Sequence, residues 1–485
     1  MRGLLRDFRD APVVWGAVLL LLAVVQCVSG MVMVMLSNAR MAMAVPGLHG
    51  RAVMFSMELS GPPLVPMIVV GMLMVLLVVS SAIRQRRRAL ALIALQGATP
   101  GQLTSRVCAQ VLLLDVAATL VSLIVSPALA RGLYPFATRQ LEANGLPFLP
   151  QDVTGMLRAW SCGIVFGFAM ALVGSLLTVR VVGGISPVEA LREAANPPKT
   201  VGVPRLVLAW IMFAGALVSL AVGLLNVRKT SMARMSVQVT FSSMSPLAYG
   251  NMIAMLLFTV SVCLAGPAVL SATVRMWTAT VRMWTAVVRL PWPAWRIACQ
   301  QARARVCASS STIIPLAAGL TLLMSYESLT STITAWTRLL PAGTPTVEVP
   351  GFARILALIG TSLVLVLAAV CSGYLIAQRG RELDLALVAV SGGTQGQLNA
   401  IAALDGLMIV VTSSLIAFVP SLLVSVSFSI GIWLSFDVLV FGMPWLLWLV
   451  VVLLLAAMAM LGSWLTAQRG IRTSPTVVIA RAAGE

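Results

Sequence analysis

Charged residues are scarce in this sequence, and several side chains on which enzymes depend are nearly absent. Only 10% of the 485 residues are charged, against about 25% in an ordinary soluble domain. There is one histidine, no HExxH pattern, and no CxxC pair among the seven cysteines. Metal-assisted hydrolysis, a zinc site and a disulfide framework are therefore not supported. We expect no metal and no cofactor bound by this chain.

Lysine is limited to two positions, and neither follows a glycine. Lys199 comes after Pro198, and Lys229 comes after Arg228. A P-loop needs a lysine directly after a glycine, because that lysine must reach the phosphates held by the loop's backbone N–H groups. The chain cannot supply a Walker A lysine, so we predict that it is not itself an ATPase.

Long apolar runs are what the sequence has in abundance, since 59% of the residues are hydrophobic. A spanning helix needs about 20 apolar residues, because all its backbone polar groups must be satisfied inside the hydrocarbon. Ten stretches meet this requirement: Ala11–Leu36, Leu64–Ile83, Val107–Ala130, Ala159–Val179, Leu206–Leu225, Met252–Leu270, Ile313–Ser328, Ile355–Ala377, Ala402–Phe428 and Met443–Leu465. The predicted fold is an all-α polytopic membrane protein with about ten transmembrane helices.

The distribution of basic residues predicts how the chain crosses the membrane. The net charge is +18, yet none of the 33 lysines and arginines falls inside the ten stretches. With the N-terminus inside, 23 of them lie in cytoplasmic segments and 10 in outer ones. This asymmetry follows the positive-inside rule and predicts a multi-pass protein of the bacterial plasma membrane with both termini cytoplasmic. Membrane lipid rather than nucleic acid is the expected partner of the positive charge.

A cytoplasmic segment occurs twice. Residues 84–103 read RQRRRALALIALQGATPGQL, and residues 379–398 read RGRELDLALVAVSGGTQGQL, with eleven identities in an ungapped alignment. Each half also ends alike, in TVRVVGGISP (178–187) and TAQRGIRTSP (466–475). One copy alone would suggest a solvated basic loop, but two copies favour a docking element. We expect a first four-helix unit at 1–200, two linking helices at 201–292 and a second four-helix unit at 293–485.

These repeated segments, together with the tail ISPVEALR at residues 185–192, resemble the FtsX-like permease family, which includes the MacB and BceB types. The resemblance implies an ABC transporter permease that binds a separate ATPase, which carries the ATP and Mg. It also implies that the repeated segments are coupling helices, and two different copies suggest two ATPase subunits per permease. The coupling residues so implied are Arg84, Arg86, Leu90, Leu92, Gly97 and Thr99, and Arg379, Arg381, Leu385, Leu387, Gly392 and Thr394.

The sequence departs from those two types in its outer loops. They carry a large external domain after the first helix of a unit, whereas here the corresponding loops, 37–63 and 329–354, have only about 27 and 26 residues. With spans rich in Met, Leu, Val and Ala, this favours export or extraction of an amphipathic or apolar substrate. Two alternatives stay open, namely an ion-gradient-driven secondary transporter and an FtsX-type mechanotransmitting regulator that transports nothing.

Two further features bear on function. The heptad TVRMWTA occurs at Thr273–Ala279 and again at Thr280–Ala286, followed by arginines at the same spacing. On a helix this segment would lie along the cytoplasmic leaflet, attracted by anionic lipid. The acids within the spans are Asp115, Asp405 and Glu327. We expect structural pairing for Asp115 and Asp405, for instance with Arg106, rather than a proton relay.

Overall fold

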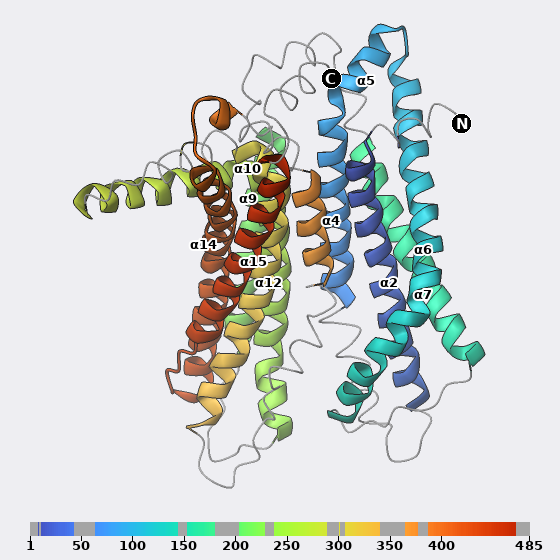
Figure 1. Ribbon diagram of the computed structural model, residues 1–485. Helices are drawn as coiled ribbons and strands as arrows, with labels where there is room; N and C mark the ends of the chain where they lie inside the picture. Colours follow the sequence, from blue (N-terminus) through green and yellow to red (C-terminus); the bar gives the residue numbers. More distant parts are fainter. Residues whose placement is uncertain are drawn as a thin grey trace. The chain divides into compact units, whose positions relative to one another are not determined.

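The structure is a computed structural model, and it describes residues 11–42, 64–143, 153–179, 203–227, 237–288, 306–339, 364–376 and 387–471, together with Phe8 and Gln300. The helices are α2 (Pro12–Ala42), α4 (Leu64–Gln85), α5 (Arg87–Leu95), α6 (Pro100–Ala143), α7 (Val153–Val179), α9 (Val203–Leu225), α10 (Val237–Val288), α12 (Val306–Thr337), α14 (Gln395–Phe436) and α15 (Trp445–Ile471). Figure 1 shows them coloured along the sequence.

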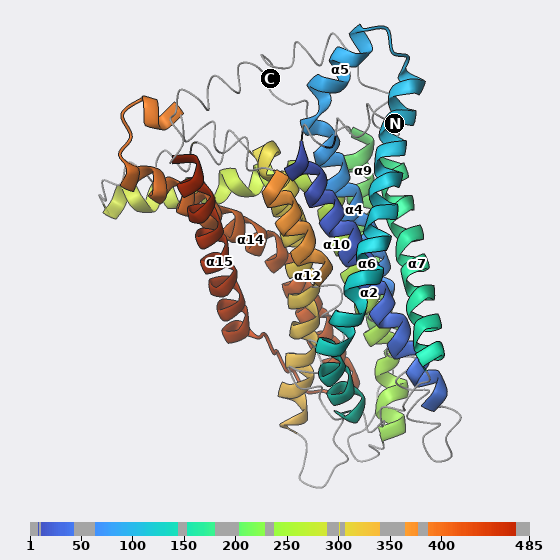
Figure 2. The same cartoon turned by 45° about the vertical axis from the view of Figure 1, so that its right-hand side comes forward.

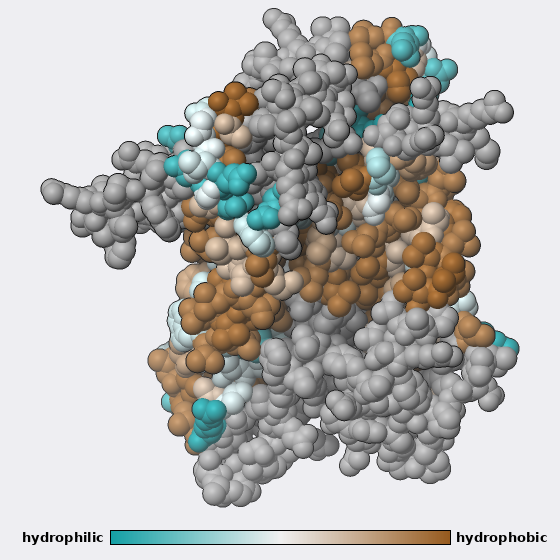
Figure 3. Space-filling view, in the orientation of Figure 1, coloured by the Kyte–Doolittle hydropathy of each residue, from teal (hydrophilic) through white to brown (hydrophobic). Residues whose placement is uncertain are grey.

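The protein is an all-α polytopic membrane protein, as the sequence predicts. Within the described residues, eight helices are long and apolar enough to cross a membrane. Two shorter apolar helices, Gly71–Ile83 and Val364–Ile376, fall where two further spans are expected. The total of ten stays a prediction. Figure 3 shows hydrophobic side chains over the described sides of the spanning helices, the surface that lipid requires.

The chain divides into two compact units that do not coincide with the repeats in the sequence. Unit 1 comprises Met1–Lys199 and Pro350–Ile376, and unit 2 comprises Thr200–Val349 and Ala377–Glu485. The three-part division expected from the sequence, into units at 1–200 and 293–485 with linking helices at 201–292, stays a prediction. In the structure, residues 350–376 pack with the first part of the chain, and residues 200–349 pack with the last part.

Unit 1 is built on a close approach of α7 to α2. A Cβ atom on Gly163 would lie 2.5 Å from the Cα of Gly30, and one on Gly167 would lie 2.8 Å from the Cα of Gln26. Gly163 and Gly167 form a GxxxG motif, which lets two helix backbones come together where the membrane offers no hydrophobic driving force. Helices α4 and α6 pack on the same pair.

The helix Val364–Ile376 belongs to the second repeat in sequence but packs within unit 1. The hydroxyl of Ser372 donates to the carbonyl oxygen of Ala17 on α2 at 2.8 Å. The side-chain amide of Gln85 at the end of α4 donates to the carbonyl of Ile376. Unit 1 therefore includes a helix from the other end of the sequence, drawn in orange beside α4 (Figure 1).

Unit 2 is organised around α12, whose spanning window is 89% buried. It packs against α14 and α10, while α9 packs on α10 and α15 on α14. Serine and threonine hydroxyls hold several of these helices together, and Ser413 on α14 donates to the carbonyl of Ile313 on α12 at 3.2 Å. By contrast, only 11% of the α15 window is buried, so α15 presents most of its surface to lipid.

Helix α10 is longer than the sixth span expected from the sequence, and its last part runs in a different direction from its spanning part (Figure 1). Its spanning part is Pro246–Gly266, and residues 267–288 continue beyond it. A proline lacks the N–H that would bond to the carbonyl four residues earlier, so Pro267 leaves the oxygen of Cys263 without its helical donor. Arg205 on α9 supplies donors here, from Nη2 to the Cys263 oxygen at 3.1 Å and from Nε to the Leu264 oxygen at 2.9 Å. The kink is thus capped by a guanidinium from a neighbouring helix.

Candidate functional site

The first copy of the repeated segment is a short helix closed by a Schellman turn. Helix α5 follows α4 after the single residue Arg86. At its end the Gly97 N–H donates to the Ala94 oxygen at 3.0 Å, and the Ala98 N–H donates to the Ile93 oxygen at 3.4 Å. These two bonds require a left-handed residue after the helix, and Gly97 has φ +96°. The glycine in the sequence repeat is therefore a requirement of the backbone.

The turn then starts the next helix with a capping box. The Gln102 N–H donates to Thr99 Oγ1 at 3.3 Å, and the Thr99 N–H donates to Gln102 Oε1 at 3.0 Å. Pro100 stands at the first position of α6, where its missing N–H costs nothing. Thr99 and Gln102, conserved between the two copies of the segment, are the two residues that a capping box needs.

The second copy has the same geometry. Gly392 has φ +94°, and its N–H donates to the Ala389 oxygen at 3.1 Å, while the Gly393 N–H donates to the Val388 oxygen at 3.0 Å. Thr394 and Gln397 form the reciprocal capping box at the start of α14, with distances of 3.4 and 3.1 Å. The repeat in sequence is therefore a repeat of one three-dimensional device, a helix, a left-handed glycine and a capped second helix.

Each copy exposes a matched pair of large apolar side chains. Leu92 and Leu95 on α5 are 49% and 54% exposed, and Leu387 and Val390 at the corresponding positions are 52% and 62% exposed. The members of each pair are three residues apart, so they lie on one face of a helical turn. Exposed leucines at the end of a membrane bundle have no lipid to cover them, which is typical of a surface that meets another protein.

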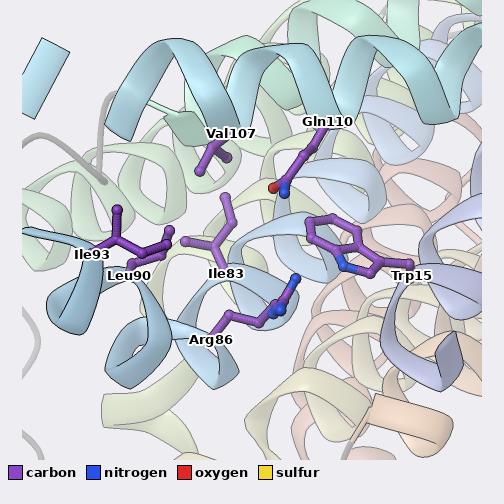
Figure 4. A pocket seen from close by; sticks show the side chains of 7 residues that line it. All are labelled: Trp15, Ile83, Arg86, Leu90, Ile93, Val107 and Gln110. Atoms are coloured by element: carbon purple, nitrogen blue, oxygen red, sulfur yellow. The ribbon is translucent and has the colours of Figure 1, made fainter. Parts of the chain in front are cut away.

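Leu90, expected to dock with Leu92, has a different position. It lines a pocket beneath α5 with Ile93 of the same helix, Val107 and Gln110 of α6, Trp15 of α2, Ile83 and Arg86 (Figure 4). The guanidinium carbon of Arg86 lies 5.6 Å from the centre of the Trp15 ring, a cation–π contact. One face of α5 is thus exposed, and the other is attached to three helices of unit 1.

The remaining expected site residues are less completely described. Arg84 lies in the last turn of α4, and Arg379, Arg381 and Leu385 lie outside the described residues. Arg86 was expected among the coupling residues, but its contact with Trp15 was not predicted from the sequence. A tryptophan near the N-terminal end of the first span is the signal that could have suggested the pairing.

Three acids lie within the spans, namely Asp115, Glu327 and Asp405. Gln26 Nε2 on α2 donates to Asp115 Oδ1 on α6 at 2.9 Å, so this buried carboxyl is bonded to the side-chain amide of another helix. Glu327 on α12 is 7% exposed, and Asp405 on α14 is partly buried. Among the residues that the structure describes, no three His, Cys, Asp or Glu side chains form a group that could hold a metal ion.

The comparisons with known proteins agree with the resemblance carried by the repeated segment. Residues 64–187 match the sequence model of the family described as FtsX-like permease C-terminal. The match begins with α4, includes α5 and its Schellman turn, and ends at the Ser-Pro pair after α7. It confirms the resemblance to the FtsX-like permeases and supports a membrane permease component. No curated protein matches the chain.

Proposed function

We propose that the chain is the permease subunit of an ABC transporter, driven by a separate ATPase that docks on the two repeated segments. The observation that carries the proposal is the duplicated device of exposed apolar pair, left-handed glycine and capping box. A regulator or secondary transporter that met no partner there would have no need of two such surfaces. The segments face the cytoplasm in this proposal, and ATP and Mg are bound by the partner.

The contacts beneath α5 support a route for coupling. A force applied to the exposed Leu92 and Leu95 displaces α5 as a rigid helix. The opposite face of α5 places Leu90 in the pocket, and Arg86, the residue before α5, stacks on Trp15. The Schellman turn joins α5 directly to α6, so displacement of α5 acts on α2 through the stack and on α6 through the backbone. Packed elements of this kind transmit displacement because close-packed interiors are stiff.

The proposed cargo is amphipathic or apolar, such as a lipid or a hydrophobic peptide, expelled or extracted outward. The described spans carry few charged side chains, and the carboxyl of Asp115 is already engaged by Gln26. A path for hydrated ions needs rings of polar or charged groups facing a cavity. Two docking surfaces on one chain support a stoichiometry of two ATPase subunits per permease.

Co-purification with the ATPase tests the docking surface. Changing Leu92 and Leu387 to Asp should remove the ATPase from the purified complex, because a charge on each exposed pair opposes burial. Leu339→Asp is the matched control, since Leu339 is 58% exposed at the far end of α12 and belongs to neither segment. Unchanged recovery of the ATPase with the double variant would reject the docking role.

Leu90→Ala separates docking from coupling. Leu90 lines the pocket rather than the exposed face, so this variant should retain the ATPase while losing stimulation of ATP hydrolysis in the reconstituted complex.

The proposed cargo is tested by measuring ATP hydrolysis of the reconstituted complex with a panel of lipids, hydrophobic peptides and ions. Stimulation of the unmodified complex by an ion alone, with none by any amphiphile, would reject the proposed cargo.

A further inference from the structure

The part of α10 beyond its span lies across the direction of the spanning helices of unit 2. Figures 1 and 2 both show this part, residues 267–288 and here called the α10 extension, projecting sideways from the end of the bundle. It lies at the same end of unit 2 as the Gly392 turn. The spanning part, Pro246–Gly266, has 21 residues, which corresponds to about 30 Å of helix and so to the full hydrocarbon thickness. The extension therefore begins where α10 leaves the hydrocarbon.

The extension is attached to α14 near its middle. Trp277 Nε1 donates to Thr412 Oγ1 at 3.2 Å, and the indole packs with Leu404 and Met408 in one buried cluster. This anchoring leaves Arg275 exposed and Met276 69% exposed. The first TVRMWTA heptad thus has one face packed against α14 and another face on which Arg275 and Met276 are exposed.

The second heptad, Thr280–Ala286, continues in the same helix. Seven residues make almost two full helical turns, so identical heptads place Arg282 within about 20° of Arg275 around the helix axis. The charge is of one sign over a long stretch, because no acidic residue occurs between Glu193 and Glu327. The extension is therefore a helix of uniformly basic charge that follows directly on the spanning part of α10.

We propose that the α10 extension is a binding site for anionic phospholipid headgroups at the cytoplasmic face of the bilayer. Interfacial helices lie with apolar groups at the acyl boundary and with arginines at the phosphates. The α10 extension has these features, since it lies across the bundle, its charge is uniformly positive and Met276 is exposed. Since Trp277 connects the extension to α14, the helix that begins at the Gly392 turn, lipid bound here also holds the cytoplasmic end of that helix in place.

The test is capture of lipid by a photo-crosslinking residue at position 279, which is Ala279 in the native chain and is exposed. The full-length protein is reconstituted in nanodiscs of phosphatidylcholine mixed with phosphatidylglycerol, and the captured lipids are identified by mass spectrometry. Phosphatidylglycerol should be enriched over its share of the disc. Arg275→Gln should lower the enrichment about fivefold, the effect of one basic residue at an anionic surface, and Arg275→Lys should preserve it.

Arg338→Gln is the control for net charge, because Arg338 is exposed beyond the last helical turn of α12 at the other end of unit 2. It should leave the enrichment at position 279 unchanged. Equal capture of the two lipids, or an enrichment that survives Arg275→Gln combined with Arg282→Gln, would overturn the proposal. The proposal would also be overturned if addition of the ATPase subunit led to crosslinking of the ATPase at position 279 in place of lipid. None of these readouts requires ATP hydrolysis, so the lipid site and the proposed transport function can fail independently.

Discussion

Replacing Arg205 by methionine should destabilise unit 2 because it removes the donors that cap the kink of α10. The guanidinium bonds to the carbonyl oxygens of Cys263 and Leu264. The Leu264 oxygen retains a helical donor in the N–H of Ala268, but the Cys263 oxygen faces Pro267 and has none. Methionine keeps the length of the side chain and its apolar contacts, so the change isolates the hydrogen bonds.

The expected cost is about 2 kcal/mol, the typical penalty for one carbonyl oxygen left without a donor away from water. Pro267→Ala restores an N–H at the kink and should reduce the cost of Arg205→Met to below about 1 kcal/mol. The double-mutant cycle therefore predicts a coupling of about 1 kcal/mol between two residues on different helices.

Unfolding by sodium dodecyl sulfate in mixed micelles, followed by tryptophan fluorescence, gives the free energy of unfolding for the four proteins. Arg338→Met serves as the control, since this arginine is exposed beyond the helical part of α12 and should change the free energy by only a few tenths of a kcal/mol. An equal cost of Arg205→Met with and without Pro267 would refute the account of the kink.

Two glycine predictions follow from the geometry and use the same unfolding measurement. Gly97→Ala should cost about 1 kcal/mol because of its positive φ, whereas Gly101→Ala, with open space at its Cβ position in α6, should not lower stability. Gly163→Ala should cost about 1 to 3 kcal/mol by forcing α7 away from α2, while Gly155→Ala near the start of α7 meets nothing within 4 Å and should be neutral. A reversed order within either pair would contradict the packing described.

The helices themselves were predictable, since apolar length alone specifies a spanning segment. The repeated segment was also predictable in detail, because a glycine followed by T-x-x-Q contains both the left-handed residue and the capping box. What the sequence could not distinguish is which leucines of that segment are exposed. Leu90 and Leu92 are two residues apart and chemically identical, and only the packing of α5 on α6 turns Leu90 into the pocket and leaves Leu92 outside.

Contacts between distant segments were not predictable for a related reason. Arg205 was counted with the cytoplasmic charges, and nothing local in the sequence connects it to a kink 62 positions away. The packing of Val364–Ile376 in unit 1 was likewise unexpected. The sequence of an apolar helix in a membrane does not indicate which other helix it packs against. Structural pairing of Asp115 was expected, for instance with Arg106, but nothing in the sequence indicated the hydrogen bond that Gln26 on another helix donates to it.

The packing of Val364–Ile376 in unit 1 has a consequence for biosynthesis. Ribosomes add about 5 to 20 residues per second, so unit 1 lacks this helix for on the order of ten seconds after Lys199 has been made. During that time the Ala17 carbonyl and the Gln85 amide are without the partners that the finished fold gives them. The nascent first half must be kept from aggregating by lipid or by the insertion machinery, and a gene cut between the two repeats would yield a first product that cannot complete its own fold.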